Sequence, residues 1–341
     1  MSLQSWLEQR WYGGVTPGLP LRLLSRLFGW LVRRRRRAFL SRQRAIFRPA
    51  VPVLVVGNIS VGGVGKTPLV IALCKALQQR GYRPGVVSRG YGRHSRGLQR
   101  IEACSDAQWV GDEPKLIFSA TGCPVAVAER RAEAAQALQA EGRVDLLIAD
   151  DGLQHYALDR DIEIAVIDGA RGLGNGQLLP AGPLREPPQR LEECDFRVSN
   201  GHYAGKPEIR MDATIELRPR RLRALGPQAR GGVSDQPLEW LQGREVHAVA
   251  GIGNPQRFFA SLRSLGAQSI EHPLPDHHRF AAADLNWPDD KPVVMTEKDA
   301  VKCEHLLRRE AFALETDLQL DDEMVERLVQ LIETRKPRAS V

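Results

Sequence analysis

The chain has 341 residues and a formal net charge of +7, and its 43% hydrophobic and 26% charged residues argue against disorder and fit a protein of two domains. The charge is uneven, because residues 1–101 carry +18 and the rest of the chain carries −11. No apolar run reaches the ~18 residues of a spanning helix, and the five cysteines lie far apart without a CxxC pair, which excludes a typical structural zinc site and favours a reducing compartment.

Residues 1–48 are predicted to form a basic, amphipathic helical segment. Leu24, Leu27, Phe28 and Leu31 follow the i, i+3, i+4, i+7 spacing of one helix face, and the arginine run 33–37 follows them. Three interpretations stay open. The helix lies in the plane of an anionic membrane surface, it packs its apolar face on the protein's own core, or its arginines bind nucleic acid. We favour the membrane, because no known nucleic-acid-binding module accompanies the run.

A phosphate-binding loop is predicted between a buried strand at 51–57 and a helix that begins near Pro68. Its glycines let backbone N–H groups surround phosphate oxygens at a helix N-terminus. The lysine reaches the β- and γ-phosphates, and the threonine hydroxyl binds Mg²⁺. Ser60 stands where the general pattern has glycine, and Val61 stands where dimeric ATPases with a similar loop carry a second lysine. The residues predicted to bind ATP are Ser60, Val61, Gly62, Gly63, Val64, Gly65, Lys66 and Thr67.

Strand patterns at 83–88, 124–128, 145–149 and 162–167, with a helix at 129–141, predict a P-loop NTPase-like, doubly wound parallel sheet. Ligands of such sheets gather at the carboxyl ends of the strands, so the polar residues that follow each strand are candidates for the site.

Asp150 and Asp151 follow the predicted strand at 145–149 and predict a Mg²⁺ site, the alternative being a simple Asp-Asp-Gly turn. Arg89 and Tyr91 follow the predicted strand at 83–88, where they suit a phosphate or sugar contact or form an exposed basic loop. Arg131 begins a helix, where a positive charge is unfavourable for the helix dipole and a functional role would explain it.

Two further residues have an ordinary and a chemical interpretation. Asp112 precedes a helix and is either its N-cap or a general base, and the residues alone favour the cap. His277 either pairs with a carboxylate and tunes a base or is a surface histidine of a loop.

The second half predicts a smaller α/β domain. Strand patterns lie at 209–217, 245–250, 268–271 and 292–296, and the stretch 218–236 is typical of a loop. The predicted organisation is a membrane-facing segment at 1–48, a P-loop kinase domain at 49–200, the smaller domain at 201–320 and a C-terminal helix and tail at 321–341.

Taken together, the motifs resemble one family, the tetraacyldisaccharide 4′-kinases, which phosphorylate lipid A precursors in Gram-negative bacteria. The segments that carry the resemblance run in family order over residues 50–300: 56–68, 88–92, 111–114, 150–155, 174–176, 179–187, 251–255, 276–277 and 296–300. Even Ser60 is expected, because the family's loop resembles this one.

The resemblance implies transfer of the γ-phosphoryl group of ATP, with Mg²⁺, to the 4′-hydroxyl of a tetraacyldisaccharide 1-phosphate, forming lipid IVA. The implied place of work is the cytoplasmic face of the inner membrane, with peripheral or monotopic attachment. The implied partners are an anionic glycolipid and that membrane leaflet, with no nucleic acid and no obligate protein partner.

The resemblance also implies site roles and so reverses the preference for a cap at Asp112. It makes Asp112 the base, supported by His277 from the second domain. If Asp112 comes from the P-loop domain, this pair forms only when the domains close. Thr67, Asp150 and Asp151 serve the metal. The implied contacts of substrate or nucleotide are Arg89, Tyr91, Glu113, Arg131, Gln154 and His155.

Two other classes stay open: a P-loop ATPase that acts as a switch or metal-insertion factor on a partner protein, and a nucleic-acid-binding ATPase.

Overall fold

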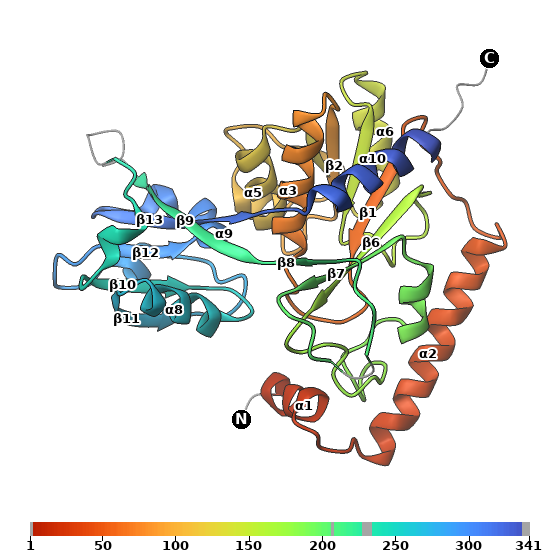
Figure 1. The fold of residues 1–341 in the computed structure, drawn as a ribbon, viewed down its shortest axis with the longest axis horizontal. Helices are drawn as coiled ribbons and strands as arrows, with labels where there is room; N and C mark the ends of the chain where they lie inside the picture. The colour runs from red at the N-terminus through yellow and green to blue at the C-terminus, as the bar shows by residue number, and fades with distance from the viewer. Residues whose placement is uncertain (1–2, 206–207, 227–233, 336–341) are drawn as a thin grey trace. The chain divides into compact units, whose positions relative to one another are not determined.

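A computed structural model describes residues 3–205, 208–226 and 234–335 (Figure 1). The chain divides into two compact units, and each is considered by itself. Unit 1 comprises Met1–Arg89, Cys123–Glu216 and Gln319–Val341, and unit 2 comprises Gly90–Gly122 and Leu217–Leu318. The predicted boundaries at 200 and 320 lie near two of these divisions, but residues 90–122, assigned from the sequence to the P-loop domain, belong to unit 2.

The elements of unit 1 follow the predicted alternation of strands and helices. The helices are α1 (Leu3–Tyr12), α2 (Leu19–Leu40), α3 (Lys66–Gln79), α6 (Arg131–Ala140), the 3₁₀ helix η1 (Pro188–Glu193) and α10 (Asp322–Arg335). The strands are β1 (Val53–Gly57), β2 (Pro84–Ser88), β4 (Val125–Val127), β5 (Leu146–Asp150), β6 (Ile162–Asp168), β7 (Phe196–Asn200) and β8 (Ala213–Ile215).

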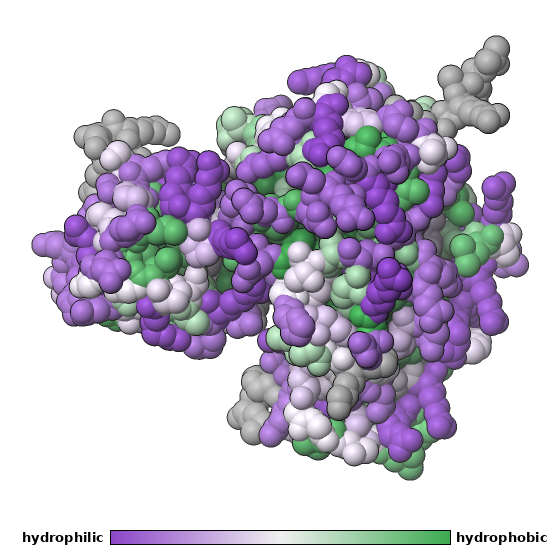
Figure 2. All heavy atoms as spheres, in the orientation of Figure 1, coloured by the Kyte–Doolittle hydropathy of each residue, from purple (hydrophilic) through white to green (hydrophobic). Residues whose placement is uncertain are grey.

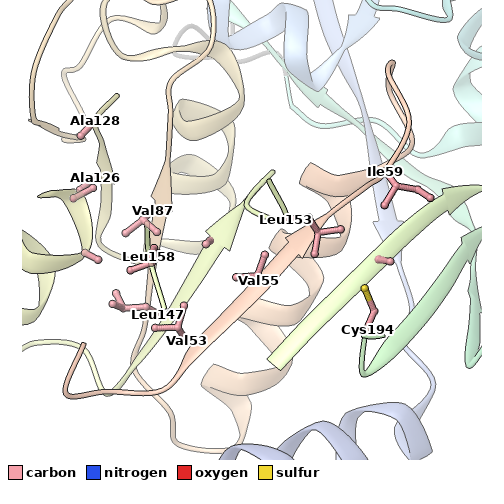
Figure 3. Packing of buried hydrophobic residues seen from close by; sticks show 14 of the residues in the cluster. Val53, Val55, Ile59, Val87, Ala126, Ala128, Leu147, Leu153, Leu158 and Cys194 are labelled. Carbon is pink, nitrogen blue, oxygen red and sulfur yellow. The ribbon is translucent and has the colours of Figure 1, made fainter. Parts of the chain in front are cut away.

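The sheet of unit 1 runs in the order β4-β2-β5-β1-β6-β7-β8, and its paired strands are parallel. Apolar strands buried on both faces suit such a sheet. Val53 and Val55 of β1 pack with Leu147 of β5 on the face that α6 covers with Ala134 and Leu138 (Figure 3). The predicted strands and the doubly wound fold are confirmed, and the carboxyl ends of β1 and β5 meet at one edge of the sheet.

Unit 2 is a smaller α/β unit. Its helices are α4 (Ala107–Val110), α5 (Asp112–Thr121), η2 (Leu238–Leu241), α8 (Pro255–Ser264), η3 (Ala282–Leu285), α9 (Glu297–Cys303) and η4 (Glu304–Leu306), and its strands are β3 (Gln99–Arg100), β9 (Leu217–Ala224), β10 (Glu245–Ala250), β11 (Gln268–Pro273), β12 (Val293–Thr296) and β13 (Ala311–Leu318). The sheet order is β11-β10-β12-β13-β9, with only β9 antiparallel to its neighbour. Helix α5 packs against α9, which is why residues 90–122 belong to this unit.

The loop predicted at 218–236 is wrong in its first part, because residues 217–224 form β9. Its arginines find carboxylates on the paired strand: the Nε atoms of Arg221 and Arg223 lie 2.7 and 3.3 Å from the Glu315 carboxylate. Residues 227–233 of that prediction lie outside the described part of the chain. The strand expected at 209–217 is shorter, with only Ala213–Ile215 in β8.

Helix α2 buries Ser25, Gly29 and Phe39, and not its leucines. The Ser25 hydroxyl donates to the carbonyl oxygen of Leu178 at 2.8 Å. A Cβ at Gly29 would lie 2.7 Å from the Leu178 side chain, so the close approach needs glycine. The prediction that the apolar face packs on the protein's own core is therefore wrong.

The leucines of α2 lie at the surface instead. The most exposed apolar side chains of the helix's middle turns are between 49% and 54% exposed: Leu23, Leu24, Leu27, Trp30 and Leu31. Hydrophobic side chains are visible at the surface near the lower end of α2 in Figure 2. Such a contiguous apolar stripe indicates a surface that contacts a membrane or another protein. Within the described residues, no helix has both the length and the apolar character needed to cross a bilayer.

Candidate active site

The glycine loop of unit 1 connects β1 to α3 in the way the sequence predicts. Gly62 and Gly65 have φ angles of +102° and +91°, which only glycine adopts without strain. Gly65 is the N-cap of α3, and a Cβ there would lie 2.5 Å from the Asn200 side-chain nitrogen. The helix N-terminus therefore opens onto the loop with its backbone N–H groups available to an anion.

Lys66, the first residue of α3, places its ammonium group beside this helix terminus. Its Nζ lies 3.4 Å from Asp151 Oδ1 and 3.3 Å from the side-chain oxygen of Asn58. A lysine held by one carboxylate at the start of a P-loop helix can exchange that partner for a phosphate.

Two aspartates lie next to the glycine loop, since Asp151 contacts Lys66. Asp150 is the buried last residue of β5, and Asp151 follows with a φ of +48°. Burial alone would raise the pKa of Asp151, but Lys66, Arg185 and Arg131 lower it below its usual value. Asp151 is therefore ionised at neutral pH, and the predicted Asp-Asp-Gly turn exists as part of a charged site.

Arg185 and Glu186 also belong to this site, although neither was predicted to be a site residue. Arg185 Nη1 lies 3.2 Å from Asp151 Oδ2, and its backbone N–H donates to the carbonyl oxygen of Ile59 at 2.6 Å. Gln154 bridges Glu186 and the backbone oxygen of Asn58, at 3.1 and 3.0 Å. The available signal was a basic and an acidic residue within the motif segment 179–187.

Arg131 and His155 hold the aspartate turn in place through hydrogen bonds. The buried Arg131 guanidinium donates to the backbone oxygens of Asp150 and Asp151 at 3.1 and 2.9 Å. The backbone N–H of Arg131 donates to His155 Nε2 at 3.2 Å. Burial, followed by the charges of Arg131 and Arg160, lowers the pKa of His155 to about 3, so this imidazole is neutral and accepts the first N–H of α6. Arg89 is exposed at the end of β2.

Unit 2 contains the second group of candidate residues. His277 Nδ1 lies 3.1 Å from Asp112 Oδ2, and both side chains are largely buried. Asp112 is the first residue of α5, whose N-cap is Gly111, so the interpretation of Asp112 as the cap is wrong. The expectation that these two residues come from different domains is also wrong, because both lie in unit 2.

The surroundings of this pair are polar and charged. The Tyr91 ring lies 5.4 Å from the His277 ring, and Glu113 Oε1 lies 3.3 Å from Lys298 Nζ. Asp112, His277 and Tyr91 border a small cavity of about 30 Å³ that Phe280 and Lys302 also line. A carboxylate that is held by an imidazole and borders a cavity has the chemistry of a general base for a hydroxyl.

Comparisons with known proteins match this chain to one family. The model of the family described as LpxK, tetraacyldisaccharide-1-P 4′-kinase, matches residues 18–333. A tetraacyldisaccharide 4′-kinase of Hahella chejuensis is 46% identical over 332 residues, covering 95% of each chain, and one of Xanthomonas euvesicatoria is 49% identical over 297 residues, covering 86% of each. The crystal structure of LpxK from Aquifex aeolicus in complex with ATP superposes with a TM-score of 0.76 at 29% identity, covering 91% of this chain and 96% of that one.

Proposed function

The chain belongs to the tetraacyldisaccharide-1-P 4′-kinase family, and from that premise we propose how its residues divide the work. It is an ATP-dependent lipid kinase that phosphorylates the 4′-hydroxyl of tetraacyldisaccharide 1-phosphate, forming lipid IVA in lipid A biosynthesis. The observation that supports this most strongly is Lys66, seated at the N-terminus of α3 beside an ionised carboxylate, in a chain matched by the family over residues 18–333.

Unit 1 binds the nucleotide. The loop residues Ser60–Thr67 surround the phosphates with backbone N–H groups, and Lys66 leaves Asp151 to pair with the β- and γ-phosphates. Arg185, already 3.2 Å from Asp151, supplies further positive charge to the transferred group.

The donor set for Mg²⁺ consists of the Thr67 hydroxyl and the carboxylates of Asp150 and Asp151. It fits the ion, because these are hard oxygen ligands and the contact between Lys66 and Asp151 ties the aspartate turn to the helix start that carries Thr67. Within the described ranges there is no cluster of three His, Cys, Asp or Glu side chains of the kind that holds a metal unaided. When bound, Mg²⁺ neutralises charge on the phosphates.

Unit 2 supplies the base. Asp112 accepts the proton of the 4′-hydroxyl, the oxygen electron pair forms the new bond to the γ-phosphorus, and the bond to the ADP oxygen breaks. His277 orients the carboxylate. Turnover requires that this base reach the nucleotide, so we propose that the two units close on the substrates and exclude water.

The six proposed substrate or nucleotide contacts divide by their surroundings. Arg131 acts through the aspartate turn, to which it donates, and His155 acts through Arg131, whose backbone N–H it accepts. Gln154 acts through the backbone oxygen of Asn58, which precedes the glycine loop. Arg89 and Tyr91 are exposed and suit direct contact with phosphate or sugar, while Glu113 acts through Lys298.

The exposed leucine stripe of α2 meets the membrane surface in this proposal. The stripe and the arginines that follow it suit the interface of an anionic leaflet, which is where a tetraacylated substrate resides. The arginine run then serves lipid and not nucleic acid. We place the enzyme at the cytoplasmic face of the inner membrane, as a peripheral or monotopic protein.

Leu24→Glu/Leu27→Glu is expected to lower the partition of the protein onto vesicles that contain anionic lipid by roughly tenfold or more, because two half-exposed apolar side chains leave the interface. Sedimentation with vesicles measures this, and Leu24→Met/Leu27→Met is the matched control. Deletion of residues 1–45 is expected to weaken both vesicle binding and lipid turnover. Unchanged partition of the Glu variant would contradict the membrane assignment.

The activity is tested with purified protein, Mg·ATP and tetraacyldisaccharide 1-phosphate, by following the phosphorylated lipid. A product phosphorylated at the 4′-position is the expected result. ATP hydrolysis without any phosphorylated lipid would favour the alternative of a P-loop switch.

A further inference from the structure

The second nitrogen of the His277 ring has its own partner in unit 2. While Nδ1 lies 3.1 Å from Asp112, Nε2 lies 3.5 Å from the Nζ of Lys298, on helix α9. The Lys298 side chain is only 18% exposed, and its ammonium group also lies 3.3 Å from Glu113 and 3.4 Å from Asp276. Lys298 is therefore held in place by two carboxylates while it faces the imidazole.

This contact decides where the ring proton resides. An ammonium group has only hydrogens to offer, so a hydrogen bond from Lys298 requires a lone pair on Nε2. In a neutral ring the single proton then lies on Nδ1, from which it donates to Asp112. The opposite tautomer would present a lone pair to the carboxylate and a proton to the ammonium group.

Other charged and aromatic groups also face the His277 ring. They are the carboxylates of Asp112 and Asp276, the Tyr91 ring and the ammonium group of Lys298. Burial lowers the pKa of Lys298, but Glu113, Asp276 and Asp112 outweigh it and raise that pKa above its usual value, so the lysine stays charged.

The backbone fixes the ring in this position. His277 has a φ of +58°, which is unusual for a residue with a side chain, and its N–H donates to Asp276 Oδ1 at 3.0 Å. Asp276 thus holds both the histidine backbone and Lys298. Helix α9 begins at Glu297, and the side chain of its N-cap Thr296 accepts from the Asp299 N–H.

We propose that Lys298 is a positioning residue that holds His277 in the Nδ1–H tautomer, which donates to Asp112. The inference rests on the proposed role of Asp112 as the base. A donor on Nδ1 orients the carboxylate that takes up the hydroxyl proton.

Three substitutions of Lys298 separate the effect of its charge from the effect of its hydrogen bond. Lys298→Arg keeps the charge and the donor, Lys298→Gln keeps a donor without charge, and Lys298→Met keeps neither. Histidine ¹⁵N NMR reads the tautomer and the charge of His277, and kcat is measured against pH with Mg·ATP and tetraacyldisaccharide 1-phosphate. Lys291→Met is the matched control, because Lys291 is a lysine of unit 2 paired with Asp289, 2.9 Å away.

The wild-type and Lys298→Arg proteins are expected to show an Nδ1–H ring and the same pH profile of kcat. Lys298→Met is expected to lower kcat roughly 10- to 100-fold, the worth of one charge-assisted hydrogen bond, and to give a mixture of the two tautomers. Lys298→Gln, whose side-chain amide still donates, is expected to keep the Nδ1–H tautomer and to lower kcat less than Lys298→Met does.

An unchanged ¹⁵N spectrum of His277 in folded Lys298→Met would overturn the proposal, and so would an Nε2–H ring in the wild type. If Lys298→Met fails to fold, the wild-type ¹⁵N spectrum decides, because an Nε2–H ring there contradicts the assignment. These results are separable from a failure of the proposed base, since that failure is read from Asp112→Asn alone.

Discussion

Asp112→Asn is expected to lower kcat for phosphorylation of the lipid by about 10²- to 10⁴-fold, the usual contribution of a positioned general base. Asparagine keeps the size of the side chain and can still contact His277, but it cannot accept the proton of the sugar hydroxyl. Because Asp112 is proposed to act on the sugar hydroxyl and not to bind the nucleotide, the affinity for ATP is expected to change by less than about twofold. Steady-state kinetics and titration calorimetry with Mg·ATP measure the two quantities.

Asp317→Asn is the matched control, an exposed carboxylate on β13 of the same unit. It is expected to leave kcat and ATP affinity unchanged. If Asp112→Asn lowered the affinity for ATP and left kcat unchanged, the assignment of Asp112 as the base would be contradicted.

Lys66→Met is expected to differ from Asp112→Asn, because it should lose both ATP affinity and phosphoryl transfer. Its ammonium group lies at the N-terminus of α3, 3.4 Å from Asp151, so its removal leaves the phosphates one cation short and the aspartate with fewer counter-charges. We expect kcat to fall about 10²- to 10³-fold and the Kd for Mg·ATP to rise about tenfold or more.

Lys75→Met serves as the control for this variant, since Lys75 is an exposed lysine on the same helix. Its kcat and Kd are expected to match those of the wild type. A Lys66→Met protein that binds Mg·ATP and phosphorylates lipid as the wild type does would contradict the assignment of the glycine loop.

The elements around the glycine loop could be predicted because their signals are local. The strand at β1, the glycines and the apolar strand that ends at Asp150 lie in short segments whose periodicity and composition suffice. Their neighbours in space were harder to foresee. Arg185 reaches Asp151 across a loop whose path depends on backbone contacts with Ile59 and Val61, and no periodicity encodes those contacts.

The division into units could not be predicted from local patterns. Helix α5 has buried apolar residues that would suit either core, and only its packing against α9, about 180 residues later in the chain, decides where Asp112 lies. Strand β9 was missed for a related reason. Its arginines resemble a solvated loop until the carboxylate of Glu315 on β13 neutralises them. The helix of α2 was predicted correctly, but the burial of Ser25 and Gly29 in place of leucine was not.

The most direct test of the account is a single-turnover experiment with Asp112→Asn. Saturating enzyme with bound Mg·[γ-³²P]ATP is mixed with tetraacyldisaccharide 1-phosphate, and labelled lipid is quantified by rapid quench. If Asp112 is the base, we expect the variant to bind ATP as the wild type does and to form labelled lipid about 10²-fold or more slowly than the wild type. Formation of labelled lipid at the wild-type rate would contradict it.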